Sequence, residues 1–229
     1  MKTIGLIGGM SWESSQHYYR LINQGVRARL GGMHSARLLM LSVDFAPIAA
    51  LQAAGDWDAL TDEMIAAAHA LERGGAEGIV IATNTMHLMA DAVAAAVDVP
   101  LLHIGDAAGI AVRAAGHRRV GLLGTAFTME RAFYADRLAR HGLDVMVPDA
   151  DDRACIHRVI YDELVQGRIE PASRAAYRGV IDRLVAQGAE AIVLGCTEIM
   201  LLIGSDDSAV PLFDTTALHA AAAVDWALG

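Results

Sequence analysis

The feature that most constrains the fold of this chain is an apolar segment that occurs twice, each time followed by a small turn. Residues 188–198 read Gly-Ala-Glu-Ala-Ile-Val-Leu-Gly-Cys-Thr-Glu, and residues 75–85 read Gly-Ala-Glu-Gly-Ile-Val-Ile-Ala-Thr-Asn-Thr. Such unbroken apolar runs are typical of parallel strands that are covered on both faces. Thr83 falls in one copy where Cys196 falls in the other. Open α/β folds place their chemistry at the carboxyl ends of these strands.

A second pair of segments repeats with nearly the same spacing. Residues 4–8 (Ile-Gly-Leu-Ile-Gly) resemble residues 120–124 (Val-Gly-Leu-Leu-Gly), and Tyr18 then corresponds to Tyr134. The offset is 116 residues for this pair and 113 for the first pair. Two matches in the same order indicate a duplicated half. We therefore predict two similar lobes that face a shared cleft.

The order of strand and helix signals predicts the fold class. Apolar runs predict strands over 3–7, 36–43, 78–82, 99–104, 119–123, 143–147, 190–194 and 210–216, with helical patterns between them. This alternation predicts an α/β fold in which each lobe is a short, mostly parallel sheet flanked by helices. We place the N-terminal lobe at residues 1–98 plus 210–229 and the C-terminal lobe at 99–209.

Composition excludes several classes of function. The chain is 54% apolar, but no apolar run reaches the roughly 18 residues that a membrane span needs. The start of the chain enters a strand-like run directly, without a secretory signal, and two cysteines make no disulfide framework. We therefore expect a cytoplasmic protein. The net charge of −9 argues against a nucleic-acid partner, because such binding requires clustered Lys and Arg.

Cys196 is the strongest catalytic candidate. It follows Gly195 at the end of a predicted buried strand, and Thr197 and Glu198 are expected to begin the next helix. A thiolate is a good base and nucleophile when a helix N-terminus or a cation lowers its pKa. The alternative is a small buried apolar residue, which is the role of most free cysteines. We expect that structural role for Cys155, which lies in a helical stretch.

Neutral donors surround the predicted strand ends. Their hydroxyl and amide groups suit the oxygens of a carboxylate, although each Thr also suits an ordinary turn or cap; the candidates are Thr83, Asn84, Thr85, Thr125 and Thr128. His87 lies four residues after Thr83, where it could orient the site or assist a proton transfer. The histidines lack metal-binding spacing, so we expect no metal.

These motifs together resemble the aspartate/glutamate racemase superfamily, and within it the amino-acid racemases. The resemblance rests on four segments in the family's order: residues 5–11 (Gly-Leu-Ile-Gly-Gly-Met-Ser), 82–87 (Ala-Thr-Asn-Thr-Met-His), 123–129 (Leu-Gly-Thr-Ala-Phe-Thr-Met) and 194–198 (Leu-Gly-Cys-Thr-Glu). It implies two pseudo-symmetric α/β lobes with the active site in the cleft between them. It also implies a racemase that uses no pyridoxal phosphate or other cofactor, acts on a small amino acid, and often forms a homodimer.

The resemblance also implies roles for particular residues. In the family, two cysteines face each other across the substrate α-carbon, one removing the proton and the other returning it. The catalytic pair in this chain is then Cys196 and Thr83, with His87 as an auxiliary residue. The implied substrate-binding residues are Met10, Ser11, Asn84, Thr85, Thr125, Thr128, Thr197 and Glu198.

Thr83 departs from the family pattern, because the first catalytic cysteine of the family is replaced here. A hydroxyl is a far poorer acid or base than a thiol, so racemisation would need a relay through His87 or water. Two alternatives therefore stay open: a one-cysteine decarboxylase or isomerase acting on a dicarboxylate, and an amino-acid-binding protein without turnover. The substrates left open are aspartate, glutamate and a neutral amino acid such as homoserine. No motif marks the residue that holds its side chain, and the basic candidates are Arg20, Arg37, Arg113 and Arg168.

Overall fold

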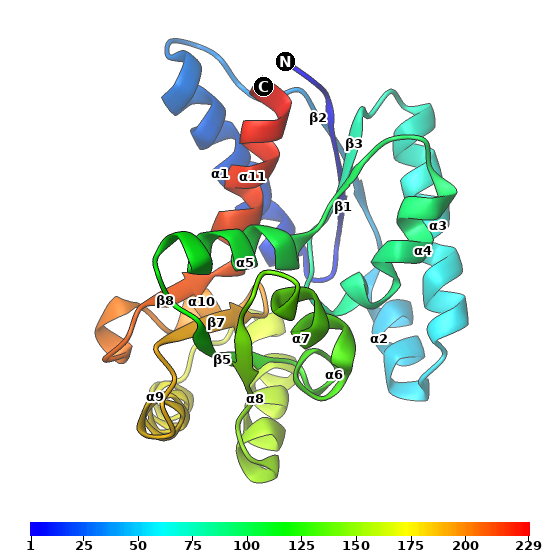
Figure 1. Cartoon of the computed structure of the whole chain (residues 1–229). Helices are drawn as coiled ribbons and strands as arrows, with labels where there is room; N and C mark the ends of the chain where they lie inside the picture. Colours follow the sequence, from blue (N-terminus) through cyan, green and yellow to red (C-terminus); the bar gives the residue numbers. More distant parts are fainter. The chain divides into compact units, whose positions relative to one another are not determined.

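The computed structural model describes residues 1–229, which divide into two compact units. Unit 1 comprises residues 1–103 and 219–229, and unit 2 comprises residues 104–218. Each unit contains a four-stranded, all-parallel sheet with helices packed against it (Figure 1). This architecture confirms the predicted fold class.

Unit 1 is built on a sheet with the strand order β2-β1-β3-β4. Its strands are β1 (Ile4–Gly8), β2 (Leu38–Ser42), β3 (Gly78–Ile81) and β4 (Leu101–Leu102). Its helices are α1 (Trp12–Leu30), α2 (Phe45–Ala54), α3 (Trp57–Arg73), the 3-10 helix η1 (Thr85–Met89) and α4 (Ala90–Ala96). Helix α11 (Thr215–Leu228) supplies the C-terminal segment of unit 1 and lies alongside α1 (Figure 1).

Unit 2 is built on a sheet with the strand order β6-β5-β7-β8. Its strands are β5 (Arg119–Gly124), β6 (Asp144–Met146), β7 (Ala191–Gly195) and β8 (Leu212–Asp214). Its helices are α5 (Ile104–Ala114), α6 (Ala126–Glu130), α7 (Ala132–Ala139), α8 (Ala150–Asp162), α9 (Pro171–Ala186) and α10 (Ile199–Leu202), with 3-10 helices η2 (Leu164–Gln166) and η3 (Ser205–Asp207).

The central strands are buried on both faces, as their apolar runs predict. In β1, Leu6 packs in a cluster with Tyr18 of α1 and Val224 of α11, while Ile7 packs in a different cluster with Met64 of α3. In β7, Val193 and Ile192 likewise belong to two different clusters. Because successive side chains of a strand point to opposite faces, this division places helices on both sides of each sheet.

The register of the strands confirms the predicted duplication. Gly5 of β1 pairs with Ile79 of β3, and Gly121 of β5 pairs with Ile192 of β7. These pairs are related by the two offsets found in the sequence, 116 and 113 residues. The two sheets also have the same order of edge and central strands. Thr83 and Cys196 therefore follow equivalent strands of equivalent sheets.

Some boundaries differ from those that the sequence suggested. Residues 210–218 lie in unit 2 rather than in the N-terminal lobe, because β8 pairs in parallel with β7. The unit boundary also lies after His103 rather than after residue 98. Helix α10 has only four residues and begins at Ile199, so it supplies much less helix dipole near Cys196 than we expected.

None of the helices combines the length and the apolar character that a membrane span requires. No group of three or more His, Cys, Asp or Glu side chains is arranged to hold a metal ion.

Candidate functional site

In unit 1, the turn after β3 buries a run of polar residues. Thr83, Asn84, Thr85 and His87 are each at least nine-tenths buried, directly after the apolar strand. The Nδ1 atom of His87 lies 2.7 Å from the carbonyl oxygen of Thr83. A carbonyl only accepts hydrogen bonds, so Nδ1 carries the hydrogen in this contact. The imidazole therefore fixes the backbone of the turn at Thr83.

A second turn of unit 1 joins β1 to α1. Gly9 has a φ of +94°, and a Cβ atom there would lie 2.2 Å from the carbonyl oxygen of Val43. The Gly9 N–H donates to the Ser15 hydroxyl (2.7 Å), which in turn donates to the Ser11 carbonyl (2.9 Å). Ser11 also caps α1 by accepting from the Ser14 N–H. Met10 and Ser11, both predicted to bind substrate, are thus buried in a rigid turn.

Two further histidines of unit 1 lie close to His87. The His103 and His87 ring centroids are 4.5 Å apart, and those of His219 and His87 are 5.7 Å apart. His219 Nε2 contacts the Leu102 carbonyl (2.8 Å), and its Nδ1 contacts the Tyr18 hydroxyl (3.0 Å). His219 and Tyr18 are fully buried, whereas His103 is partly exposed. The region next to Thr83 is therefore rich in imidazole.

In unit 2, the turn after β7 pairs the Cys196 thiol with a carboxylate. The thiol donates to Oε2 of Glu198 across 3.1 Å, and the Thr197 hydroxyl donates to the same oxygen across 2.9 Å. All three residues are buried. A Cβ atom at Gly195 would lie 2.9 Å from the Leu123 carbonyl, so glycine is required where β7 approaches β5. The three consecutive residues predicted for the site thus form one hydrogen-bonded group.

Burial and the neighbouring carboxylate raise the pKa of the Cys196 thiol well above its ordinary value. This direction is opposite to the activation that we expected from a helix N-terminus, because α10 is short and Glu198 is close. Burial, with the charges of Cys196 and Glu198 as smaller causes, also raises the pKa of Tyr161. Cys196 is therefore a thiol at neutral pH when no ligand is bound.

The turn after β5 is the counterpart of the Gly9 turn. The Thr125 hydroxyl accepts from the Thr128 N–H and lies 3.2 Å from the Thr128 hydroxyl. The N–H of the next residue, Ala126, donates to Nδ1 of His157 on α8 (3.1 Å). Burial lowers the pKa of His157, which favours the neutral ring that can accept this bond. The two threonines predicted for the site are brought together here.

Sequence reasoning missed two buried or half-buried polar residues next to these turns. Gln52, at the end of α2, is buried and its amide contacts the sulfur of Met86 across 3.3 Å. The signal was a lone Gln in the run Ala49-Ala-Leu-Gln-Ala-Ala54, where every neighbour is apolar. His157 gave no such signal, because only the fold brings α8 to the Thr125 turn.

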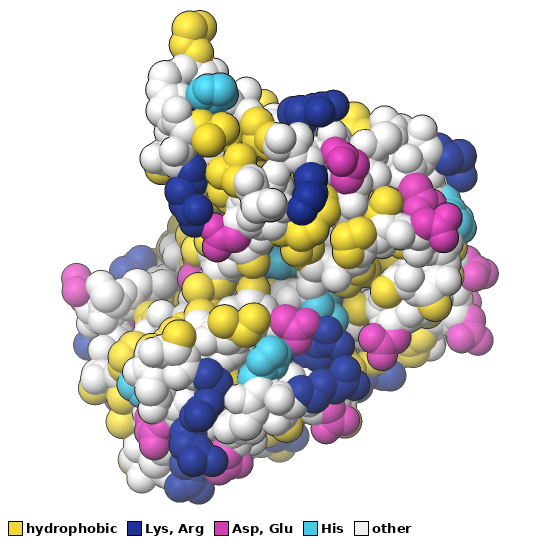
Figure 2. Space-filling model, turned by 45° about the horizontal axis from the view of Figure 1, so that its top comes forward, with side chains coloured by type: hydrophobic (Ala, Val, Ile, Leu, Met, Phe, Trp, Pro, Cys, Tyr) yellow, Lys and Arg dark blue, Asp and Glu magenta, His cyan; other side chains and the backbone are white.

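The arginines proposed from sequence to hold a substrate side chain are exposed in the structure. Arg20 contacts Nδ1 of His17, Arg113 contacts the His117 carbonyl, and Arg168 contacts the Asp162 carbonyl. Arg37 is also exposed, next to β2. On the face drawn in Figure 2, Lys and Arg side chains are interspersed with Asp and Glu rather than gathered into one basic area.

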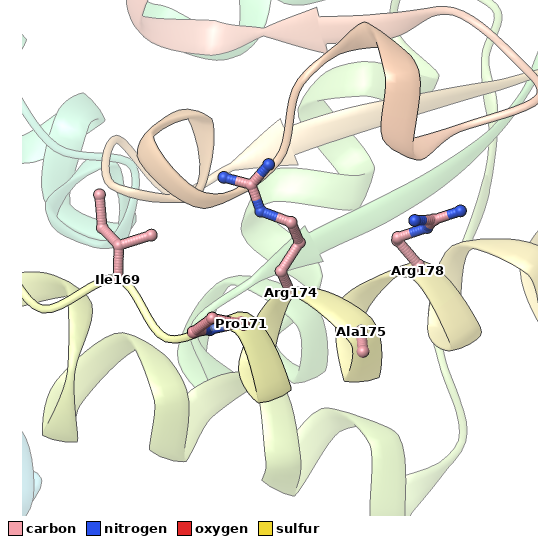
Figure 3. Close-up of a pocket in the computed structure, with 5 residues that line it drawn as sticks. All are labelled: Ile169, Pro171, Arg174, Ala175 and Arg178. Atoms are coloured by element: carbon pink, nitrogen blue, oxygen red, sulfur yellow. The ribbon is translucent and has the colours of Figure 1, made fainter.

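Two pockets in unit 2 are lined by residues other than the predicted site. One, of about 300 Å³, lies at the start of α9 and is lined by Ile169, Pro171, Arg174, Ala175 and Arg178 (Figure 3). Its two arginines lie 3.7 and 3.9 Å from the Asp207 carboxylate, which offsets part of their charge. The other, of about 560 Å³, lies beside β8 and is lined mainly by apolar residues of 200–212. Neither pocket includes Cys196 or Thr83.

Comparison with known proteins agrees with these features. The sequence model described as Asp/Glu/hydantoin racemase matches residues 7–223. An Asp/Glu racemase candidate from Yersinia pestis is 53% identical, with a TM-score of 0.93 over the full length of both chains. An aspartate racemase homologue from Pyrococcus horikoshii is 34% identical, with a TM-score of 0.86, again over both full chains. The broad specificity amino-acid racemase RacX of Bacillus subtilis is 25% identical over 74% of this chain and 73% of its own.

Proposed function

Because the chain belongs to the Asp/Glu/hydantoin racemase family, whose isomerase activity on amino acids it shares, we propose that it racemises aspartate, glutamate or a related amino acid in the cytoplasm without pyridoxal phosphate. The observation that carries this proposal is the Cys196–Glu198 group at the end of β7, equivalent in position to Thr83 at the end of β3. The relatives named as amino-acid and aspartate racemases support the substrate class.

The chemistry requires one group on each face of the α-carbon, a base to remove the proton and an acid to return one. We assign Cys196 to one face and Thr83 to the other. Because the pKa of Cys196 is raised, this residue begins the reaction as the acid and gives its proton to the α-carbon. In the reverse direction, Cys196 starts as the thiolate and acts as the base, while unit 1 supplies the returning proton.

The buried donors would hold the substrate carboxylate while negative charge develops at the α-carbon. Hydrogen bonds that strengthen as charge develops are worth several kcal/mol in a buried site, about 3–4 kcal/mol for one well-placed donor. The residues that we assign to this role are Ser11, Asn84, Thr85, Thr125, Thr128 and Thr197, with Met10 covering the ligand. Glu198 holds the Cys196 thiol and receives its hydrogen bond.

The test is α-proton exchange in D2O with the purified protein and no added pyridoxal phosphate. L- and D-aspartate, glutamate and homoserine are incubated separately, and loss of the α-proton is followed by NMR. We expect exchange with inversion for at least one amino acid, and its loss in Cys196→Ala. Absence of exchange with every amino acid would reject the racemase and favour the one-cysteine dicarboxylate chemistry, for which the Thr83/Cys196 difference is the specific support.

We also propose that the chain forms a homodimer through the outer edge of unit 1. Strand β2 is an edge strand with a half-exposed Met40 (47%), and α1 exposes Trp12 (64%) and Tyr19 (52%), which lie two helical turns apart on one face. Contiguous exposed apolar patches mark interfaces, and we propose that these three side chains belong to one. Arg37 and Asp44 flank opposite ends of β2, so two antiparallel copies of this strand would place opposite charges together.

Light scattering after size-exclusion chromatography tests the dimer. We expect the wild-type mass to be twice that of one chain, and we expect Met40→Glu to give the monomer, because a charge would be buried at the centre of the contact. Met33→Glu is the matched control, since Met33 is almost fully exposed in the α1–β2 loop. A monomeric wild type, or a dimer unaffected by Met40→Glu, would reject this interface.

A further inference from the structure

The His87 and His103 imidazoles of unit 1 lie at positions where unit 2 has none, and this difference matches the difference in catalytic group. His87 is four residues after Thr83, and the residue four after Cys196 is Met200. By strand register, Leu102 of β4 corresponds to Phe213 of β8, so His103 corresponds to Asp214. Unit 2, which has the Cys196 thiol, therefore lacks imidazole at both positions. Unit 1, which has the Thr83 hydroxyl, has imidazole at both.

A threonine hydroxyl alone cannot store a proton or a negative charge near neutral pH, because it does not titrate there. Imidazole has an ordinary pKa near 6.5 and can do both. From these two observations we propose that the His87–His103 pair is the proton store of unit 1, and that Thr83 passes protons between this pair and the substrate. This inference rests on the proposed racemase function and goes beyond it by naming the group that holds the proton.

One ring nitrogen of His87 is able to accept a proton. Its Nδ1–H donates to the Thr83 carbonyl across 2.7 Å, so in the neutral ring the basic atom is Nε2. When the Thr83 oxygen takes the α-proton, its own hydroxyl proton moves to Nε2 through one bridging water. The substrate becomes a carbanion and the ring becomes an imidazolium, so the net charge of the site does not change. The return step reverses both transfers.

His103 connects this ring to solvent. The His87 ring is almost completely buried, whereas His103 is partly exposed, and the two ring centroids are 4.5 Å apart. After a turnover in which Thr83 removes the α-proton and Cys196 returns one, the site holds an extra proton on imidazole and a thiolate at Cys196. Loss of the first proton through His103 to water and recovery of a proton by the thiolate restore the starting state.

Tyr18 and His219 act as positioning residues behind this pair. The Leu102 carbonyl can only accept, so Nε2 of His219 carries a hydrogen, while Nδ1 pairs with the Tyr18 hydroxyl. Both ring nitrogens are therefore engaged. Because Leu102 immediately precedes His103, the Tyr18–His219–Leu102 chain fixes the backbone that carries His103.

The experiment compares His87→Asn with the wild type in the D2O exchange assay, using each enantiomer of aspartate and glutamate separately. The amide N–H of Asn can replace Nδ1–H toward the Thr83 carbonyl, but an amide cannot store a proton. We expect inversion to fall by about 10²-fold or more, in line with the loss of a general acid–base group. Exchange without inversion should persist for the one enantiomer whose α-proton meets Cys196, and added imidazole should partly restore inversion.

His103→Asn should also lower inversion while exchange persists for one enantiomer, but to a smaller extent. This second variant keeps the test valid if His87→Asn folds poorly. His34→Asn, an exposed residue of the α1–β2 loop, is the control and should match the wild type. Equal loss for both enantiomers with no response to imidazole, or unchanged inversion in His87→Asn, would overturn the proton store while leaving the racemase intact. A wild type that exchanges neither enantiomer would instead overturn the racemase function, and the proton store with it.

Discussion

Unit 1 and unit 2 have the same sheet order and the same register between their central strands, but they present different groups at the same strand end. Unit 2 places a buried thiol against a carboxylate, and unit 1 places a hydroxyl residue next to buried imidazoles. The backbone was kept after duplication, while the side chains that handle protons diverged. The comparison shows that an equivalent position in a fold specifies where chemistry occurs rather than which group performs it.

The largest expected effect comes from making the two strand ends alike. Cys196→Thr would leave hydroxyls at both ends, and we expect inversion to fall by about 10²- to 10⁴-fold, the usual range for loss of an acid–base group. Thr83→Cys would place thiols at both ends and should not abolish inversion. Exchange rates measured by NMR in D2O for both enantiomers test the pair of variants. Retention of most inversion in Cys196→Thr would show that unit 2 does not depend on its thiol.

The next largest effect is a loss of stability on replacing Gly5 of β1 or its equivalent, Gly121 of β5. A Cβ atom at Gly5 would lie 2.7 Å from Cβ of Ala76, which is fixed to the backbone, whereas at Gly121 it would meet the flexible tips of Ile192 (2.7 Å) and Leu184 (2.9 Å). We expect Gly5→Ala to lower the free energy of unfolding by about 2–3 kcal/mol and Gly121→Ala by about 1 kcal/mol, within the range for overpacked cores. Urea unfolding of both variants measures the difference, and equal losses would contradict it.

Replacing the equivalent tyrosines Tyr18 and Tyr134 with Phe should change the stability of the protein in opposite directions. The Tyr18 hydroxyl bonds to His219, whereas the buried Tyr134 hydroxyl has no hydrogen-bond partner, and burial raises its pKa. Tyr18→Phe should cost about 1 kcal/mol, and Tyr134→Phe should be neutral or stabilise by up to about 1 kcal/mol, since an unpaired polar group is removed. Thermal unfolding should then shift by about 2–4 °C per kcal/mol. A loss of stability in Tyr134→Phe would indicate a partner for that hydroxyl, such as a buried water.

The smallest expected effect is a loss of stability at alkaline pH. The pKa of Cys196 is raised in the folded protein, so its contribution to stability is complete below the unfolded-state value of about 8.5 and is lost as pH rises toward the folded value. We expect the free energy of unfolding to fall between about pH 8 and 9.5, below the range in which tyrosines titrate. Cys196→Ala should flatten this slope, while Thr83→Ala should leave it unchanged, because a hydroxyl does not titrate there. Identical slopes in all three proteins would contradict the raised pKa.

Much of the fold could be predicted from the sequence because the signals are local. The unbroken apolar run before Cys196 and its copy before Thr83 specified buried parallel strands, and the two offsets predicted the duplication that the strand registers confirm. The edge strand β8 was assigned to the wrong half, because a short apolar run does not reveal which strand it pairs with.

The chemistry of the turns was harder to predict, since it depends on contacts between distant segments. The sequence marked Cys196 but not the direction of its pKa shift, which follows from burial and from the distance to Glu198. It marked His87 but not its closeness to His103 and His219, which are 16 and 132 residues further along the chain. Gln52 and His157 reach the turns only through packing.

The division of the units has a consequence for synthesis on the ribosome. Residues 219–229, which include most of α11, complete the core of unit 1 with Ala220, Ala223, Val224 and Ala227. Unit 1 is begun first but cannot bury the face of α1 until residues 219–229 are translated, whereas unit 2 is continuous and is finished earlier. The usual N-to-C order of domain folding is therefore reversed for the final step. A chain truncated after residue 218 and released from the ribosome should protect unit 2 from protease better than unit 1.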